Sequence, residues 1–226
     1  MAIRQIGSTA RPSIPEGIAA SPIEPDDVLD DASFSDVSVT GAQLAQTNAS
    51  HVMLARARLA KVNLSESRLP RLDASDVEFA ECNLSNLRCT NASFRQVSFS
   101  NCKLTGMHIA SSTFVDVEFE NCRLDFASFD RAKFKHVTFR GSLVRDSDFS
   151  ETTLDHVRFV DCDLSRVTFA RIRAQRSELQ RSVLGGLRGL AELRGFAMSW
   201  NDILANADLF ASALGIEVRS EPPVDE

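Results

Sequence analysis

Tyrosine is absent from this chain, tryptophan occurs once, and glycine and proline are sparse, at 10 and 7 of 226 residues. Tight protein interfaces are usually anchored by Tyr and Trp, so the surface has few such anchors. No apolar run approaches the roughly 20 residues that cross a bilayer, and residues 1–10 lack the apolar segment of a signal peptide. These absences lead us to expect a soluble, cytoplasmic protein.

Recognisable catalytic motifs are also missing. The sequence contains no nucleophile elbow, no glycine-rich phosphate loop and no His-centred acid and base pair. His136 and His156 fall in one column of the repeat described below, with Asp116 before them, and such a set could bind a metal weakly. The same column also holds Arg56 and Asp76, which favours a solvated ladder of mixed charge. We expect no enzyme activity and no cofactor.

The five cysteines do not suggest a disulfide framework, because their number is odd. Four of them belong to another column of the same repeat: Cys82, Cys102, Cys122 and Cys162. Zinc requires ligands that converge in a tetrahedron, whereas this column predicts thiols in a line. We interpret the cysteines as small buried side chains in a reducing compartment.

Charge is distributed unevenly along the chain. The net charge is −6, yet residues 32–186 hold 20 basic and 18 acidic residues. Residues 1–31 contain 2 basic and 6 acidic residues, and residues 187–226 contain 3 and 7. The excess of acid therefore belongs to the two ends, and the middle of the chain is close to neutral.

A period of five residues dominates the middle of the chain. From Phe34 to Leu184 every fifth residue is apolar, over 31 consecutive units without insertion or deletion, and 12 of the 15 phenylalanines lie in this column. This period matches neither a helix nor an ordinary strand, and it indicates a repeat architecture.

Similar residues also recur every 20 positions, as in the column Leu44, Leu64, Leu84 and Leu104. Four units therefore predict one turn of a square coil, with like side chains stacked between coils. We expect an all-β solenoid of seven full coils and most of an eighth, about 35 Å long at an interstrand spacing of about 4.8 Å. Layers of Phe and Leu should fill its interior and leave no pocket.

The domain organisation follows from these patterns. Residues 1–31, with four prolines and an acidic patch, should form an arm that is extended or disordered, or a strand that caps the first coil. Residues 32–186 form the β-helix, residues 187–218 a C-terminal cap and dimerisation module, and residues 219–226 a tail. Within the cap we expect one helix of about three turns, with Asn201 as its N-cap and Gly215 at its end.

The five-residue units resemble the pentapeptide-repeat family. The clearest are ASFRQ at 92–96, CRLDF at 122–126 and ASFDR at 127–131. This resemblance implies a right-handed quadrilateral β-helix, in agreement with the columns of like residues.

The C-terminal segment has a narrower resemblance. The stretch from GLRGL at 186–190 through Trp200 to LGIEV at 214–218 is similar to the C-terminal module of the Qnr and MfpA proteins, which protect DNA gyrase from fluoroquinolones. The unbroken repeat register resembles the loop-free members of this group more than the loop-bearing ones. The resemblance implies a homodimer that imitates duplex DNA. The dimerisation residues that it implies are Trp200, Ile203, Ala207, Phe210, Leu214, Ile216 and Val218.

Two functions are consistent with these features. One is a non-enzymatic dimeric rod that binds and modulates or protects a type II topoisomerase, DNA gyrase, by DNA mimicry and so confers quinolone or toxin resistance. The other is a repeat scaffold for another cytoplasmic protein, without mimicry. Neither involves direct contact with nucleic acid or a membrane.

The near-neutral repeat body is unfavourable for DNA mimicry, because DNA carries one charge per about 1.7 Å of its axis. A continuous acidic stripe would favour the topoisomerase, and a patchy surface would favour the scaffold. The candidate partner-binding residues are two acidic clusters and an outward phenylalanine: Glu78, Glu81, Glu118 and Glu120; Asp146, Asp148 and Glu151; and Phe126.

Overall fold

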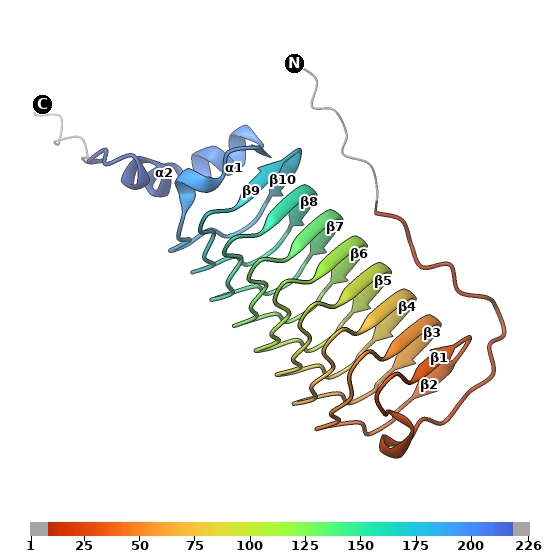
Figure 1. Cartoon of the computed structure of the whole chain (residues 1–226). Coiled ribbons are helices and arrows are strands. Elements are labelled where there is room, and N and C mark those ends of the chain that lie inside the picture. The colour runs from red at the N-terminus through yellow and green to blue at the C-terminus, as the bar shows by residue number, and fades with distance from the viewer. Residues whose placement is uncertain (1–8, 219–226) are drawn as a thin grey trace, which may run out of the picture.

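A computed structural model describes residues 9–218 and shows a parallel β-solenoid of about eight turns with two short helices near the C-terminus (Figure 1). Each strand pairs in parallel with its equivalent on the next coil, as in Ala57 with Val77 and Val77 with Val97. The expected all-β solenoid is therefore confirmed. In the described part of the chain, no helix combines the length and apolar character needed to span a bilayer.

Each coil has four sides. We name them the first to fourth face, after residues 52–56, 57–61, 62–66 and 67–71 and their equivalents on the other coils. Long strands run across the first and second faces, and isolated bridges such as Asn63 with Asn83 and Arg68 with Arg88 join the third and fourth. The strands are β1 Ser33–Ser35, β2 Ser38–Thr40, β3 Met53–Ala60, β4 Asp73–Ala80, β5 Ser93–Ser100, β6 Thr113–Glu120, β7 Lys133–Arg140, β8 Thr153–Val160, β9 Arg173–Gln175, β10 Ser177–Gln180 and β11 Phe196–Met198.

The corners between faces place one residue in the left-handed region. At the corner between the third and fourth faces the backbone also closes a turn, as where Leu87 N donates to Leu84 O at 3.2 Å. The third residue of that turn, Asn86, has φ of 57°. Turns of this kind favour Gly and Asn at that position, because their side chains tolerate positive φ.

Stacked phenylalanines fill the rod from its middle to its C-terminal end. The Phe79 and Phe99 rings lie 4.9 Å apart at an interplanar angle of 5°, and the Phe99 and Phe119 rings lie 4.8 Å apart. Offset stacking of this kind contributes about 0.5–1.5 kcal/mol per pair beyond the burial of area. The same stack continues through Phe139 to Phe159.

The interior is not completely filled, so the expectation of no internal pocket is wrong. An apolar cavity of about 40 Å³ lies in the N-terminal half, and its lining includes Leu44, Leu54, Leu59 and Leu64. Leu54 and Leu59 stand at positions where later coils carry phenylalanine, as in Phe94 and Phe79. The smaller side chains reach less far across a coil of the same width, and a void remains between them.

The first coil is covered by the chain that precedes it. Ile23 and Val28 are buried in the core cluster, on either side of the 3-10 turn Pro25–Asp27. Before this cover, residues 9–21 run along the outside of the second face, and Ala20 forms an isolated bridge with Ser38. This segment lies beside the rod in Figure 1.

The C-terminal segment covers the other end. β11 pairs with β10, and the ring of Phe196 lies 6.5 Å from that of Phe159 and 6.2 Å from that of Phe169. A 3-10 turn, Leu190–Glu192, precedes β11, and the helices α1 (Trp200–Ala205) and α2 (Ala207–Ala213) follow it. Apolar cover is required here, because a bare terminal coil exposes its core and unpaired backbone groups.

The expectation of one helix capped by Asn201 is wrong. Ser199 is the N-cap, and its hydroxyl accepts a hydrogen bond from Asp202 N at 3.1 Å. Asn206 separates the two helices: its φ is −121°, and its side chain donates to Asp202 O at 2.8 Å. Gly215, with φ of 72°, ends the second helix as expected.

We predict that Phe119→Asp destroys the cooperative unfolding of the rod. Phe119 is 0% exposed between two stacked rings, so a carboxylate there should cost about 3–5 kcal/mol or more. Thermal unfolding followed by circular dichroism measures this loss. Phe126→Asp is the matched control, because Phe126 is 64% exposed and should change stability by less than about 0.5 kcal/mol. A normal melting curve for Phe119→Asp would contradict the assignment of the core.

The internal cavity gives a second prediction. Leu59→Phe should extend the Phe79 stack into the cavity and raise the free energy of unfolding by about 0.5–1 kcal/mol, measured by chemical denaturation. Leu124→Phe makes the same change where Phe rings already fill the layer. It should lower the free energy of unfolding by about 1–3 kcal/mol. Equal effects of the two substitutions would show that the cavity is not a packing defect.

Candidate interaction surfaces

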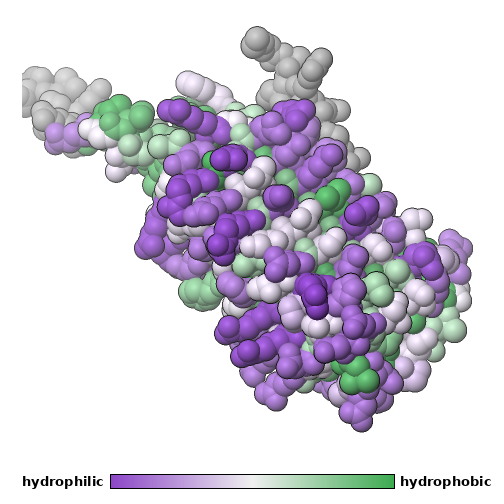
Figure 2. Space-filling model, in the orientation of Figure 1, coloured by the Kyte–Doolittle hydropathy of each residue, from purple (hydrophilic) through white to green (hydrophobic). Residues whose placement is uncertain are grey.

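Many charged side chains on the outer surface pair with a partner on the neighbouring coil. Arg166 donates to both carboxylate oxygens of Asp146, at 2.6 and 2.7 Å, and Arg181 makes the same contact with Asp161 at 2.6 and 2.8 Å. Arg56 pairs in this way with Asp36. The two members of each pair occupy equivalent positions, because the register of the coils places such positions side by side. The visible face of the rod is accordingly hydrophilic, with scattered apolar residues (Figure 2).

These pairs change the protonation behaviour of the carboxylates. The hydrogen bond from Arg166 lowers the pKa of Asp146 below its ordinary value of 3.8, and that from Arg171 lowers the pKa of Glu151 below 4.5. A carboxylate with a lowered pKa stabilises the folded state when the pH is above the ordinary pKa of that group. This contribution is lost as the pH falls through the lowered pKa. Because the pairs are exposed, water and salt screen them and each contributes little.

The first acidic cluster lies on the second face and its corner, and most of it is neutralised. Glu78 accepts a hydrogen bond from Arg58 at 3.1 Å. Glu81 lies 3.9 Å from Lys61, and Glu118 lies 3.8 Å from Arg140. Glu120 makes no ion pair with any residue between 9 and 218.

The second acidic cluster lies on the third and fourth faces and is also occupied. Asp146 pairs with Arg166, and Glu151 accepts a hydrogen bond from Arg171 at 2.5 Å. Asp148 accepts hydrogen bonds from the backbone N and hydroxyl of Ser150, at 2.8 and 2.5 Å. The two clusters are on different sides of the rod, and basic groups neutralise most of both.

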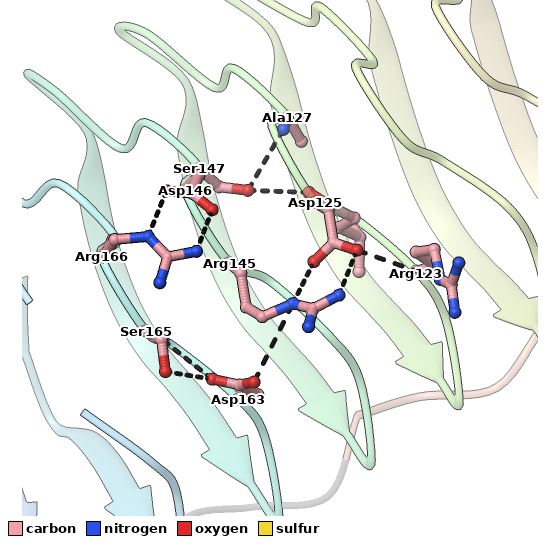
Figure 3. Close-up of polar contacts among 10 residues, drawn as sticks. Arg123, Asp125, Ala127, Arg145, Asp146, Ser147, Asp163, Ser165 and Arg166 are labelled. Atoms are coloured by element: carbon pink, nitrogen blue, oxygen red, sulfur yellow. Dashed lines mark hydrogen bonds and ion pairs between the residues drawn. The ribbon is translucent and has the colours of Figure 1, made fainter. Parts of the chain in front are cut away.

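An ion-pair network around one buried carboxylate on the third face was missed in the sequence (Figure 3). Asp125, whose side chain is 7% exposed, accepts hydrogen bonds from Arg145 Nε and Nη2 at 2.9 and 2.8 Å. Arg145 also lies 3.9 Å from Asp163, and Arg123 lies 3.9 Å from Asp125. The signal that could have revealed it is the opposite charge at equivalent positions of successive coils.

Phe126 follows this network and projects from a corner. Its φ is 60°, and every other non-glycine residue with positive φ in the described chain has a polar or charged side chain. The equivalent corner residues on the two adjacent coils are Gly106 and Asp146. They leave the Phe126 ring uncovered, since Gly106 has no side chain and Asp146 is bound to Arg166. A bulky exposed side chain in this conformation is costly, and such features often mark functional sites.

The backbone around Phe126 is rigidly held. Phe126 N donates to Arg145 O at 2.9 Å, and Ala127 N donates to the Ser147 hydroxyl at 3.1 Å. That hydroxyl in turn donates to Leu124 O at 2.7 Å. A rigid aromatic group loses little entropy on binding, which is what an interface anchor requires.

The residues implied in dimerisation lie on the C-terminal module with different exposures. Ile203 and Phe210 are half-buried, and Ala207 is exposed. The rest are exposed apolar side chains: Trp200 at 73%, Leu214 at 76%, Ile216 at 57% and Val218 at 60%. Exposed apolar surface of this kind marks sites of protein association.

The histidines and cysteines that the sequence offers as candidate metal ligands have other contacts or are buried. His136 Nδ1 lies 3.4 Å from Asp116, and His156 Nδ1 lies 2.8 Å from Asp155. Within residues 9–218, no group of three or more His, Cys, Asp or Glu side chains is arranged to hold a metal ion. The cysteines are all buried, and loss of hydration raises the pKa of Cys89 to about 12 and that of Cys162 to about 11.

The fold and the five-residue units define a class of protein, the β-solenoid built from pentapeptide units. The family described as "Pentapeptide repeat region" matches residues 72–149 and 112–188, and the one described as "Pentapeptide repeats (8 copies)" matches residues 29–69. These matches extend over more than half of the chain. The chain belongs to the pentapeptide-repeat family.

Several solved structures are similar to this chain. QnrB1, a plasmid-mediated fluoroquinolone resistance protein, is 17% identical, with 83% of this chain and 100% of QnrB1 covered and a TM-score of 0.41. HetL from the cyanobacterium Nostoc, involved in the regulation of heterocyst differentiation, is 14% identical, with coverages of 75% and 90% and a TM-score of 0.36. The pentapeptide-repeat protein Rfr23 from Cyanothece is 12% identical, with coverages of 69% and 89% and a TM-score of 0.17.

No curated protein matches the chain significantly. All three structural similarities have TM-scores below 0.5. The function must therefore be argued from this chain's own surface.

The burial of Asp125 predicts unequal effects of two arginine substitutions. Arg145→Ala leaves the buried Asp125 without its bidentate partner and should lower the melting temperature by about 5 °C or more. Arg166→Ala removes the partner of Asp146, which is more exposed, and should lower it by less than about 3 °C. Differential scanning calorimetry at pH 7 measures both values. Equal shifts would contradict the special role assigned to Asp125.

Proposed function

We propose that this protein is a non-enzymatic dimeric rod that binds a partner protein through its sides, without imitating DNA along its whole length. The pairing of its carboxylates with basic groups carries this proposal. Glu78, Asp146 and Glu151 each accept a hydrogen bond from an arginine of the same rod. A surface of this kind fits a partner through local shape and anchors such as Phe126, while its overall field is weak.

DNA mimicry makes a different demand on the surface. A duplex presents one negative charge per about 1.7 Å of its axis, and proteins that bind it release counterions. In this rod, arginine and lysine side chains neutralise most of the acidic candidates within about one coil, so no continuous acidic stripe is formed among the described residues. The geometry therefore favours the scaffold over the mimic.

A type II topoisomerase is the first partner to test. The support comes from the resemblance of residues 186–218 to the C-terminal module of the Qnr and MfpA group. The fluoroquinolone resistance named for QnrB1 is a property of that protein, and for this chain the corresponding activity is part of the proposal.

The C-terminal module supports the dimer through the apolar side chains that it leaves uncovered. Trp200, Leu204 and Leu214 are 73%, 57% and 76% exposed within residues 9–218 of one chain. A second copy would bury the same surface on both chains around a two-fold axis. The segment 216–218, with the exposed side chains of Ile216 and Val218, would lie beside its equivalent in this arrangement.

The topoisomerase activity is tested by DNA gyrase supercoiling with and without a fluoroquinolone. We expect micromolar protein to change supercoiling or to protect the enzyme from the drug, with little dependence on salt between about 50 and 200 mM potassium glutamate, because paired charges release few counterions. An effect that disappears steeply with salt would indicate DNA mimicry after all. No effect at any salt concentration would exclude the topoisomerase as the partner.

The dimer is tested by light scattering of Leu214→Asp. This substitution places a charge in the exposed apolar face and should yield a monomer, while Val183→Asp, at a 57% exposed side chain on the rod, should leave the dimer intact. Trp200 is the only tryptophan and tyrosine is absent, so intrinsic fluorescence reports this face directly. Emission should shift to the blue as the dimer forms. A parent protein of monomeric mass at all concentrations would contradict the dimer.

A further inference from the structure

The N-terminal arm, residues 9–21, lies across the second face from β7 back to β2. The Thr9 and Thr138 hydroxyls lie 2.9 Å apart, and Ser13 N donates to Asp76 Oδ1 at 2.7 Å. Nearer the first coil, Ser21 N donates to Ser38 O at 2.8 Å. The arm therefore follows the axis of the rod and crosses several coils at about a right angle to their strands.

A groove separates the arm from the sheet beneath it. Ala10, Arg11 and Pro12 form one wall, and the other side carries three carboxylates together with small side chains of β5. These carboxylates belong to Glu78, Glu118 and Glu120. Arg11 is the only basic residue of the arm, and it lies at the place where acidic side chains gather.

The arm contributes no side chain to the core. The core cluster begins at Ile23, and the only backbone ladder contact of the arm is the single bridge of Ala20 with Ser38. Pro12 and Pro15 favour an extended chain, and along residues 9–19 the contacts with the sheet are isolated hydrogen bonds. A segment held by a few exposed contacts opens at low cost in free energy.

The arm also covers a residue that would otherwise face solvent. Thr138 points outward from β7, yet it is only 4% exposed. Thr113, an outward residue at the start of β6 on the first face, is exposed. The second face is thus already occupied by the arm, an extended segment that contains proline and one arginine.

We propose that the second face between β4 and β7 is a binding groove for an extended, arginine- and proline-containing segment of a partner protein, and that the arm occupies this groove until the partner displaces it. This proposal rests on one part of the proposed function, namely that the partner is a protein. The chemistry of the groove matches this occupant. Glu120, which makes no ion pair with residues 9–218, can bind an arginine, and the serine side chains of β5 leave room for a backbone that forms no strand ladder.

The arm's position can be measured by thiol labelling of the full chain. All five native cysteines are buried and inert, so a maleimide reacts with an introduced thiol alone. In Thr138→Cys the arm should protect the thiol, and adding Arg11→Glu should raise the labelling rate about fivefold or more, because the new carboxylate faces three others. Arg11→Lys keeps the charge and should keep the protection. Thr113→Cys should label at the same rate in all backgrounds.

A synthetic peptide of residues 9–21 tests whether the groove accepts a segment from outside. Added to the Thr138→Cys and Arg11→Glu protein, it should restore protection in proportion to its concentration, and the same peptide with Arg11→Glu should not. Unchanged labelling in the Arg11→Glu protein, or no protection at millimolar peptide, would overturn the proposal. Neither outcome depends on a topoisomerase, so a negative supercoiling assay does not decide this test.

Discussion

The backbone hydrogen bonds between coils, which keep a constant register of 20 residues from β1 to β10, are the constraint on which the rest of this structure depends. They hold each residue beside its equivalents on the two neighbouring coils, as in the run from Val77 through Val97 to Val117. Side chains then meet others of the same position and similar chemistry. Inside the rod this produces stacked rings, and outside it produces ladders of polar groups.

The same register also determines the electrostatics. Because opposite charges occur at equivalent positions of adjacent coils, as in Asp146 with Arg166 and Asp125 with Arg145, the ladders neutralise themselves. An acidic chain can therefore present a weak field along its length. What distinguishes one part of the rod from another is where the ladder is interrupted, as at Phe126, whose aromatic ring replaces a polar corner residue.

The two ends carry the features that the repeat cannot provide. A solenoid must cover its terminal coils, and here each cover does more than protect the core. The N-terminal segment continues into an arm over the second face, and the C-terminal segment continues into helices that leave Trp200 and Leu214 exposed. Neutral repeats joined to specialised ends are consistent with a protein that works through contacts with other proteins.

The sequence by itself determined the period, the four faces and the inward columns, because a strict repeat with strong apolar selection allows only one register. It also predicted the end of the second helix at Gly215, but it misplaced the N-cap and missed the break at Asn206, where local side-chain hydrogen bonds compete. The tertiary structure alone decided the rest. The cavity depends on how far leucine reaches across a coil, and the buried state of Asp125 depends on Arg145. The path of the arm rests on contacts such as Thr9 with Thr138, which are far apart in the chain and leave no periodic signal.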